Sequence, residues 1–116
     1  MDQRIEALRE WGCAIDSAME RMLDDEVFYL ECLAEIPGDS NFERLTEALR
    51  ARDAATAFDC AHTLKGVLIN LGLTPMYQKA VELVEPLRAG KTDGLVAKNE
   101  ELLAMRDRLA RILAMQ

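Results

Sequence analysis

The sequence predicts an all-α fold, an antiparallel up-down four-helix bundle with additional short N-terminal helices. Leu, Ala, Glu, Arg and Met, which are good helix formers, are abundant, whereas aromatic residues make up 5% of the chain. Apolar residues recur at helical spacing, and no stretch alternates convincingly between apolar and polar residues as a strand does. The segments between the longer helices are short, which favours antiparallel neighbours.

Short helices are expected ahead of the bundle. The first covers roughly residues 3–11 and is interrupted by Gly12. Asp16 or Ser17 can cap a second helix, because Ser17 and Glu20 have capping-box spacing. The apolar residues that we expect this second helix to bury are Ala18, Met19, Met22 and Leu23.

The third helix is marked at both ends. Asp24 and Asp25 place negative charge at its positive N-terminal end. Pro37 and Gly38 end it. Ser40 and Glu43 then form a capping box at the start of the fourth helix.

Aspartate, proline and glycine mark the limits of the later helices. Asp53 caps the central helix, AATAFDCAHTLKGVLINLGL. The Thr74-Pro75 pair starts the next helix, because proline is favoured at the first helical position. Pro86 is expected to end or kink that helix. Thr92 or Asp93 begins the final helix.

The central helix has an apolar face and a second, mixed face. At about 100° per residue, one arc is apolar and forms the expected core face: Ala57, Ala61, Leu64, Leu68 and Leu71. The second arc carries His62, Lys65, Gly66 and Ile69, with Phe58 one turn before His62. This stripe contains no carboxylate, and Phe58 and Ile69 offer apolar contact for docking a partner.

His62 is the only histidine in the chain, and a lone helical histidine is most often an ordinary surface residue. Lys65 by itself is an ordinary solvated lysine. A glycine inside a helix costs about 0.5–1 kcal/mol relative to alanine. Gly66 could offset this cost by permitting close helix packing or by letting a bulky partner approach His62. The residues alone leave these interpretations open.

Residues 61–73, AHTLKGVLINLGL, closely resemble the signature of histidine-containing phosphotransfer (HPt) domains, the modules of multistep phosphorelays. The family pattern is a histidine, lysine and glycine at the third and fourth positions after it, and a further glycine ten positions after it. Here these residues are His62, Lys65, Gly66 and Gly72. The flanking helices fit as well, so the resemblance covers nearly the whole chain.

The resemblance implies a phosphocarrier of two-component, bacterial-type signalling. Family members accept a phosphoryl group on the histidine from an aspartyl phosphate of a receiver domain and return it to another receiver. Accordingly, His62 would be phosphorylated, Lys65 would stabilise the phosphoryl charge and Gly66 would provide clearance. The partners would be response-regulator receiver domains or a hybrid histidine kinase. Because the family has no ATP site and magnesium belongs to the receiver, we expect no kinase activity, no cofactor and no metal.

One feature departs from the family pattern. Many members place a polar residue of the following helix, often glutamine, against the histidine. An antiparallel helix would return to the height of His62 at residues 84–86. There Val84 is apolar, Glu85 is negative and Pro86 disturbs the helix. The residue that supports His62 from this helix is therefore left open.

Composition restricts the class of protein. The formal net charge of -7 disfavours nucleic acid and anionic membranes as partners and favours proteins. The charged start MDQRIEALREW lacks a signal core, and no apolar run is long enough to span a bilayer. Cys13, Cys32 and Cys60 have no metal-ligand spacing, which predicts reduced thiols packed in helices. We therefore expect a cytoplasmic protein.

The size of the chain points to one domain and leaves two alternative functions. The chain has 116 residues, 50% of them hydrophobic, which is enough for one core and too few for two. We therefore expect a single domain over residues 1–116. One alternative is a helical adaptor that binds receivers without being phosphorylated. The other is a structural helical domain, for example one excised from a larger sensor kinase.

Overall fold

The computed structural model describes residues 2–116, and that range contains helices and connecting turns but no strand. The predicted all-α class is therefore confirmed. In chain order the elements are α1 Gln3–Trp11, α2 Ile15–Arg21, α3 Glu26–Glu35, the 3-10 turn η1 Ile36–Gly38, α4 Ser40–Arg50, α5 Ala54–Asn70, α6 Thr74–Arg88 and α7 Leu95–Leu113.

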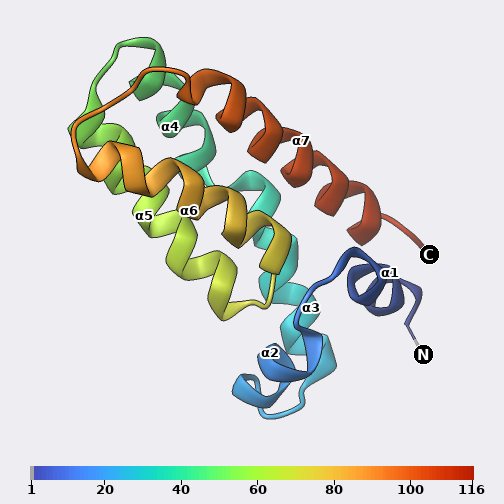
Figure 1. Ribbon diagram of the computed structural model, residues 1–116. Helices are drawn as coiled ribbons and strands as arrows, with labels where there is room; N and C mark the ends of the chain where they lie inside the picture. Colours follow the sequence, from blue (N-terminus) through green and yellow to red (C-terminus); the bar gives the residue numbers. More distant parts are fainter. Residues whose placement is uncertain (1) are drawn as a thin grey trace.

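Helices α4 to α7 form the predicted bundle (Figure 1). Contacts join α4 to α5, α5 to α6, α6 to α7 and α7 back to α4, which closes a ring of four helices. Short α1, α2 and α3 lie at one end of the bundle, with α1 near the C-terminal end of α7 (Figure 1). The molecule measures 44 by 24 by 21 Å.

The core continues from the bundle into the N-terminal helices. On α5, the predicted apolar arc is buried, with Leu64 and Leu68 fully inaccessible to solvent. Ile5 and Leu8 of α1 and Leu33 of α3 belong to the same cluster of buried side chains. The N-terminal helices therefore extend the core of the bundle.

The predicted Asp53 cap is confirmed, and Asp25, predicted to place negative charge at the start of the third helix, also caps it. The Asp53 carboxylate accepts a hydrogen bond from the Thr56 backbone N–H at 3.1 Å, at the start of α5. The Asp25 carboxylate accepts one from the Phe28 N–H at 3.0 Å, at the start of α3. Asp53 therefore caps the helix that carries His62.

The predicted start of α2 is wrong. The helix begins at Ile15, before both Asp16 and Ser17. The Ala14 N–H donates to the carbonyl of Gly72 at 2.8 Å, so a contact with a distant turn fixes the chain just ahead of the helix. The Asp16 carboxylate instead accepts a hydrogen bond from the Arg9 side chain at 2.7 Å.

Two further predicted starts are wrong. Helix α4 is capped by Asp39, whose carboxylate accepts from the Asn41 N–H at 2.8 Å, instead of by a Ser40 capping box. The last helix begins at Leu95 and not at Thr92 or Asp93. Gly94 precedes it with a φ of 75°, and this left-handed conformation keeps the helix from starting earlier.

Three other expectations need correction. Helix α6 continues through Pro86 to Arg88, so the proline does not end it. Leu23, predicted to be buried, is 90% exposed, since the chain leaves α2 through left-handed conformations at Leu23 and Asp24. Cys13 lies between α1 and α2 and not within a helix, although its thiol, like the other two, is free.

Candidate functional site

His62 lies near the middle of α5, and its side chain is exposed. The same helix buries Ala61 and Leu64 against the core, which turns position 62 outward. The predicted placement of His62 on a face separate from the core therefore agrees with the structure.

An aromatic stack holds one side of the imidazole. The ring centroids of Phe58 and His62 are 5.4 Å apart, and the two planes are inclined by 27°. The guanidinium carbon of Arg88, on α6, lies 5.2 Å from the centroid of the Phe58 ring. Glu85 Oε2 lies 3.9 Å from Arg88 Nε. The Phe58 ring of α5 thus lies between the Arg88 guanidinium of α6 and the His62 imidazole.

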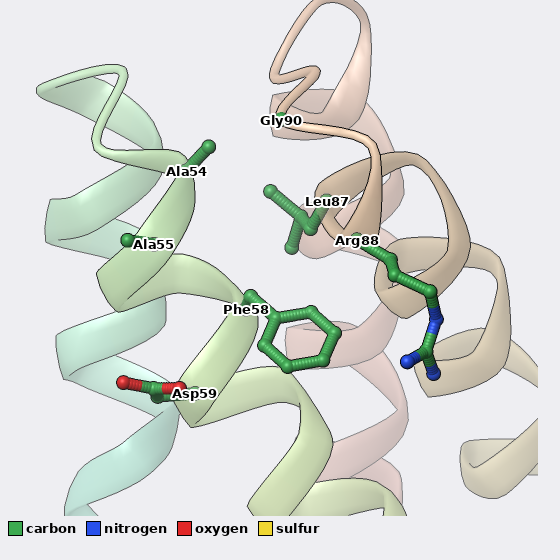
Figure 2. A pocket seen from close by; sticks show the side chains of 7 residues that line it. All are labelled: Ala54, Ala55, Phe58, Asp59, Leu87, Arg88 and Gly90. Carbon is green, nitrogen blue, oxygen red and sulfur yellow. The ribbon is translucent and has the colours of Figure 1, made fainter.

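Beside this stack the surface is hollowed between α5 and α6. Figure 2 shows the Phe58 ring between the two helices, with the Arg88 guanidinium beyond it and Asp59 on the opposite side. The hollow has a volume of about 500 Å³. Its lining residues are Ala54, Ala55, Phe58, Asp59, Leu87, Arg88 and Gly90.

This geometry also sets the height at which α6 passes the histidine. Phe58 faces Leu87 and Arg88, and α6 runs antiparallel to α5. One turn further along α5, His62 therefore lies level with Val84, one turn earlier in α6. Val84 is apolar and fully buried, so the residue of α6 at this height offers the imidazole no polar side chain.

Lys65 and Gly66 follow His62 by about one turn of α5. Lys65 is half-buried, and Gly66 is exposed. A Cβ atom added at Gly66 would find nothing within 4 Å apart from its own helix. Close helix packing therefore does not explain this glycine, and the surface next to His62 is open.

The two apolar residues of the stripe differ in exposure. Ile69 is 43% exposed, whereas Phe58 is half-buried against His62 and Arg88. The stripe therefore presents an accessible imidazole, a nearby cation, an open glycine and one exposed aliphatic side chain. Within residues 2–116, no three His, Cys, Asp or Glu side chains gather as a metal site.

Arg88 is the residue of this site that the sequence did not single out as part of the stripe. It lies on α6, and its approach to Phe58 depends on the register between two helices. A cation spaced three residues after Glu85 is a common pattern on exposed helix surfaces. No local signal distinguishes Arg88 from such an ordinary pair.

A protein-family model described as the Hpt domain matches residues 31–114. The chain belongs to the Hpt domain family. Comparisons with curated proteins and with solved structures found no match. As an Hpt domain, the protein is a phosphotransfer module of two-component systems. The Hpt match begins within α3, so α1 and α2 precede it. Every helix in residues 2–116 is too short or too polar to cross a bilayer.

Proposed function

We propose that this Hpt domain carries a phosphoryl group on His62 between receiver domains. The exposed imidazole beside the open surface of Gly66 is the observation that carries this proposal. A receiver carries its phosphate on an aspartate within a folded domain. The acceptor histidine therefore has to be reachable by a large partner.

The chemistry needs one nucleophilic nitrogen. A lone pair of the neutral His62 imidazole attacks the phosphorus of the aspartyl phosphate, an N–P bond forms, and the P–O bond to the aspartate breaks. The aspartate leaves as a carboxylate. The reverse exchange with a second receiver regenerates the free imidazole, so the domain acts as a carrier and needs no ATP site of its own.

The neighbouring residues support the transfer in different ways. The Lys65 ammonium group stabilises the negative charge on the transferring phosphoryl group. Gly66 leaves room for the receiver. The Phe58 ring, with Arg88 on it, limits the orientations of the imidazole, and Ile69 supplies apolar contact to the partner.

Reconstitution of the relay tests this proposal. A receiver carrying radiolabelled phosphate is mixed with the protein, and a second receiver is then added. Label should appear first on the protein and then on the second receiver. The His62→Gln variant should block both steps, whereas Glu100→Gln, an exposed change on α7, should leave them intact. Receiver binding without any label on the wild-type protein would instead support an adaptor.

A further inference from the structure

We propose that a cavity between α4 and α7 binds a small neutral molecule that carries one hydrogen-bond donor on an apolar body. The cavity is lined by Thr46 of α4 and Asn99 of α7, among other residues. The two helices are neighbours in the bundle (Figure 1), and neither carries a residue of the His62 stripe. The site is therefore separate from phosphoryl transfer on His62.

Asn99 is an unusual residue for the core of a helical bundle. It is 2% exposed, and within residues 2–116 it is the only buried side chain of the amide or charged kind. Buried polar groups are nearly always hydrogen-bonded, because losing contact with water costs free energy. Asn99 meets this requirement only in part, since no group in the described part of the chain donates to its Oδ1 atom.

The neighbouring hydroxyl group of Thr46 determines which end of the amide is unpaired. The Thr46 hydroxyl donates to the Phe42 carbonyl at 2.9 Å, so its proton is already used. Its oxygen can then only accept, and Asn99 Nδ2 donates to it at 2.9 Å. Turning the amide over would place two acceptors against each other. The unpaired group of Asn99 is therefore its oxygen, which is an acceptor.

The cavity that Asn99 lines is small and mostly apolar on its inner side. It has a volume of about 170 Å³ and lies between the last turns of α4 and the first turns of α7. Leu49 is buried and Leu103 is half-buried, so both give the inner wall an apolar surface. The outer rim is exposed and carries side chains of both charges. An unpaired acceptor thus accompanies an apolar hollow.

Size, charge and hydrogen bonding together define the ligand. A cavity of about 150 Å³ can hold a benzene-sized molecule, so this cavity is too small for a nucleotide or a folded partner. The inner residues carry no charge, and a buried ion without a counter-charge is strongly disfavoured. Only a donor can pair with the Asn99 oxygen. A single-ring phenol, or a similar neutral molecule with one O–H or N–H group, meets all three conditions.

A ligand in this cavity would tie together two helices that close the ring of the bundle. Helix α7 contacts α4 on one side and α6 on the other. The ligand would contact Leu49 on α4 and Leu103 on α7, and its donor would pair with Asn99. Because the cavity exists only in the folded chain, binding there stabilises the fold.

Phenol and toluene separate the hydrogen bond from apolar contact, because they have equal numbers of non-hydrogen atoms and only phenol has a donor. Titrations followed by amide NMR give a dissociation constant for each compound. The ratio of the two constants is compared between proteins, which cancels the difference in hydration. Asn99→Leu keeps a similar side-chain shape without the acceptor, so it should shift this ratio about tenfold against phenol. Asn70→Leu, at an exposed asparagine of α5, is the matched control and should leave the ratio unchanged.

Leu103→Phe provides a second test in case Asn99→Leu is unstable. The larger side chain should fill the cavity and weaken the binding of both compounds, and melting curves check the fold. Phenol should also raise the melting temperature of the wild-type protein. Absence of saturable phenol binding, as expected if the cavity admits only water, would overturn the proposal. An unchanged ratio in a folded Asn99→Leu protein, or phenol-induced shifts confined to the His62 surface, would do the same.

Discussion

At the scale of single residues, the two glycines of the signature have opposite surroundings. Gly72 has a φ of 73°, and a Cβ atom there would lie 2.5 Å from the Ala14 carbonyl oxygen. Gly66 has helical backbone geometry and open space around it. The structure therefore requires glycine at position 72 for folding, whereas no packing contact requires it at position 66. The proposed function gives Gly66 its role, which is to leave access to His62.

Substitution of Gly66 sets stability against function. Gly66→Ala should raise the free energy of unfolding by about 0.4–1 kcal/mol, because the unfolded chain loses freedom. Phosphoryl transfer from a receiver should slow, and Gly66→Gln should slow it further because a longer side chain obstructs the approach. Melting curves and transfer rates measure both effects. Gly72→Ala, as a contrast, should destabilise the protein. A stable Gly66→Gln protein with full transfer would contradict this account.

Lys65 should affect transfer without affecting the fold. Its side chain is half-buried and follows His62 by about one turn. Lys65→Ala should lower the transfer rate about tenfold or more, since one charge that stabilises a transition state is lost. Lys65→Arg, which keeps the charge, should retain more activity. Rapid-quench measurements give the rates, and circular dichroism checks the fold. Equal rates for all three proteins with every competent receiver would make Lys65 an ordinary surface lysine.

The sequence predicted most of the His62 stripe because one helix holds it. Positions 62, 65, 66 and 69 share a face in any regular helix, so the pattern needs no tertiary information. Arg88 and Arg21 could not be predicted in the same way. Arg88 meets Phe58 across two helices, and Arg21 meets carbonyls 48 and 49 residues away. Such contacts depend on how the helices dock.

At the scale of the helix, the N-cap of α5 supports the element that carries the site. Asp53→Ala should lower the melting temperature by a few degrees, because the Thr56 N–H loses its partner. Hydrogen bonds from Thr56 also lower the pKa of Asp53 below its usual 3.8. The cap is therefore at full strength above that pH and weakens as the folded-state carboxylate becomes protonated in acid.

Thermal melts over a pH series check this prediction. The difference in melting temperature between wild type and Asp53→Ala should be constant near neutrality and shrink well below pH 3.8. Asp59→Ala, an exposed carboxylate on the same helix, serves as the control. A difference that persisted unchanged in strong acid would show that the Asp53 carboxylate does not cap α5.

Local sequence patterns predicted where the helices lie better than they predicted the first residue of each helix. Asp53 was predicted as a cap, and Asp25 as negative charge at a helix start, because an aspartate before an apolar helix is a strong local pattern. The Ser40 box failed because Asp39, one residue earlier, already caps the helix. Leu23 was expected inside because helical spacing was extended beyond the end of α2. Periodicity predicts burial only while the helix continues.

At the scale of the whole molecule, the hydrophobic core includes residues that precede the Hpt match. The match begins at residue 31, whereas the core includes Ile5, Leu8 and Ile15. Arg108 of α7 also lies over the Trp11 ring, 4.6 Å from its centroid. We propose that residues 2–116 fold as one unit, as the size of the chain suggests.

Leu8→Ala tests this unity. Leu8 is fully buried, so the change should reduce the free energy of unfolding by about 2–5 kcal/mol. Trp11, the only tryptophan, reports on α1, and far-ultraviolet circular dichroism reports on all helices. The two denaturation curves should coincide and shift together. Loss of the tryptophan signal at lower denaturant, with the helical signal unchanged, would instead make α1 a separate appendage.

The most direct test of the central claim is intact-protein mass spectrometry after reaction with a phosphorylated receiver. The account predicts that the wild-type protein gains one phosphoryl group, which acid removes and alkali leaves in place, as expected for phosphohistidine. It predicts no gain for His62→Gln, although that variant should melt at nearly the wild-type temperature because His62 is exposed. A phosphoryl group of equal occupancy on His62→Gln, or none on the wild-type protein with any competent receiver, would contradict the assignment of His62 as the carrier.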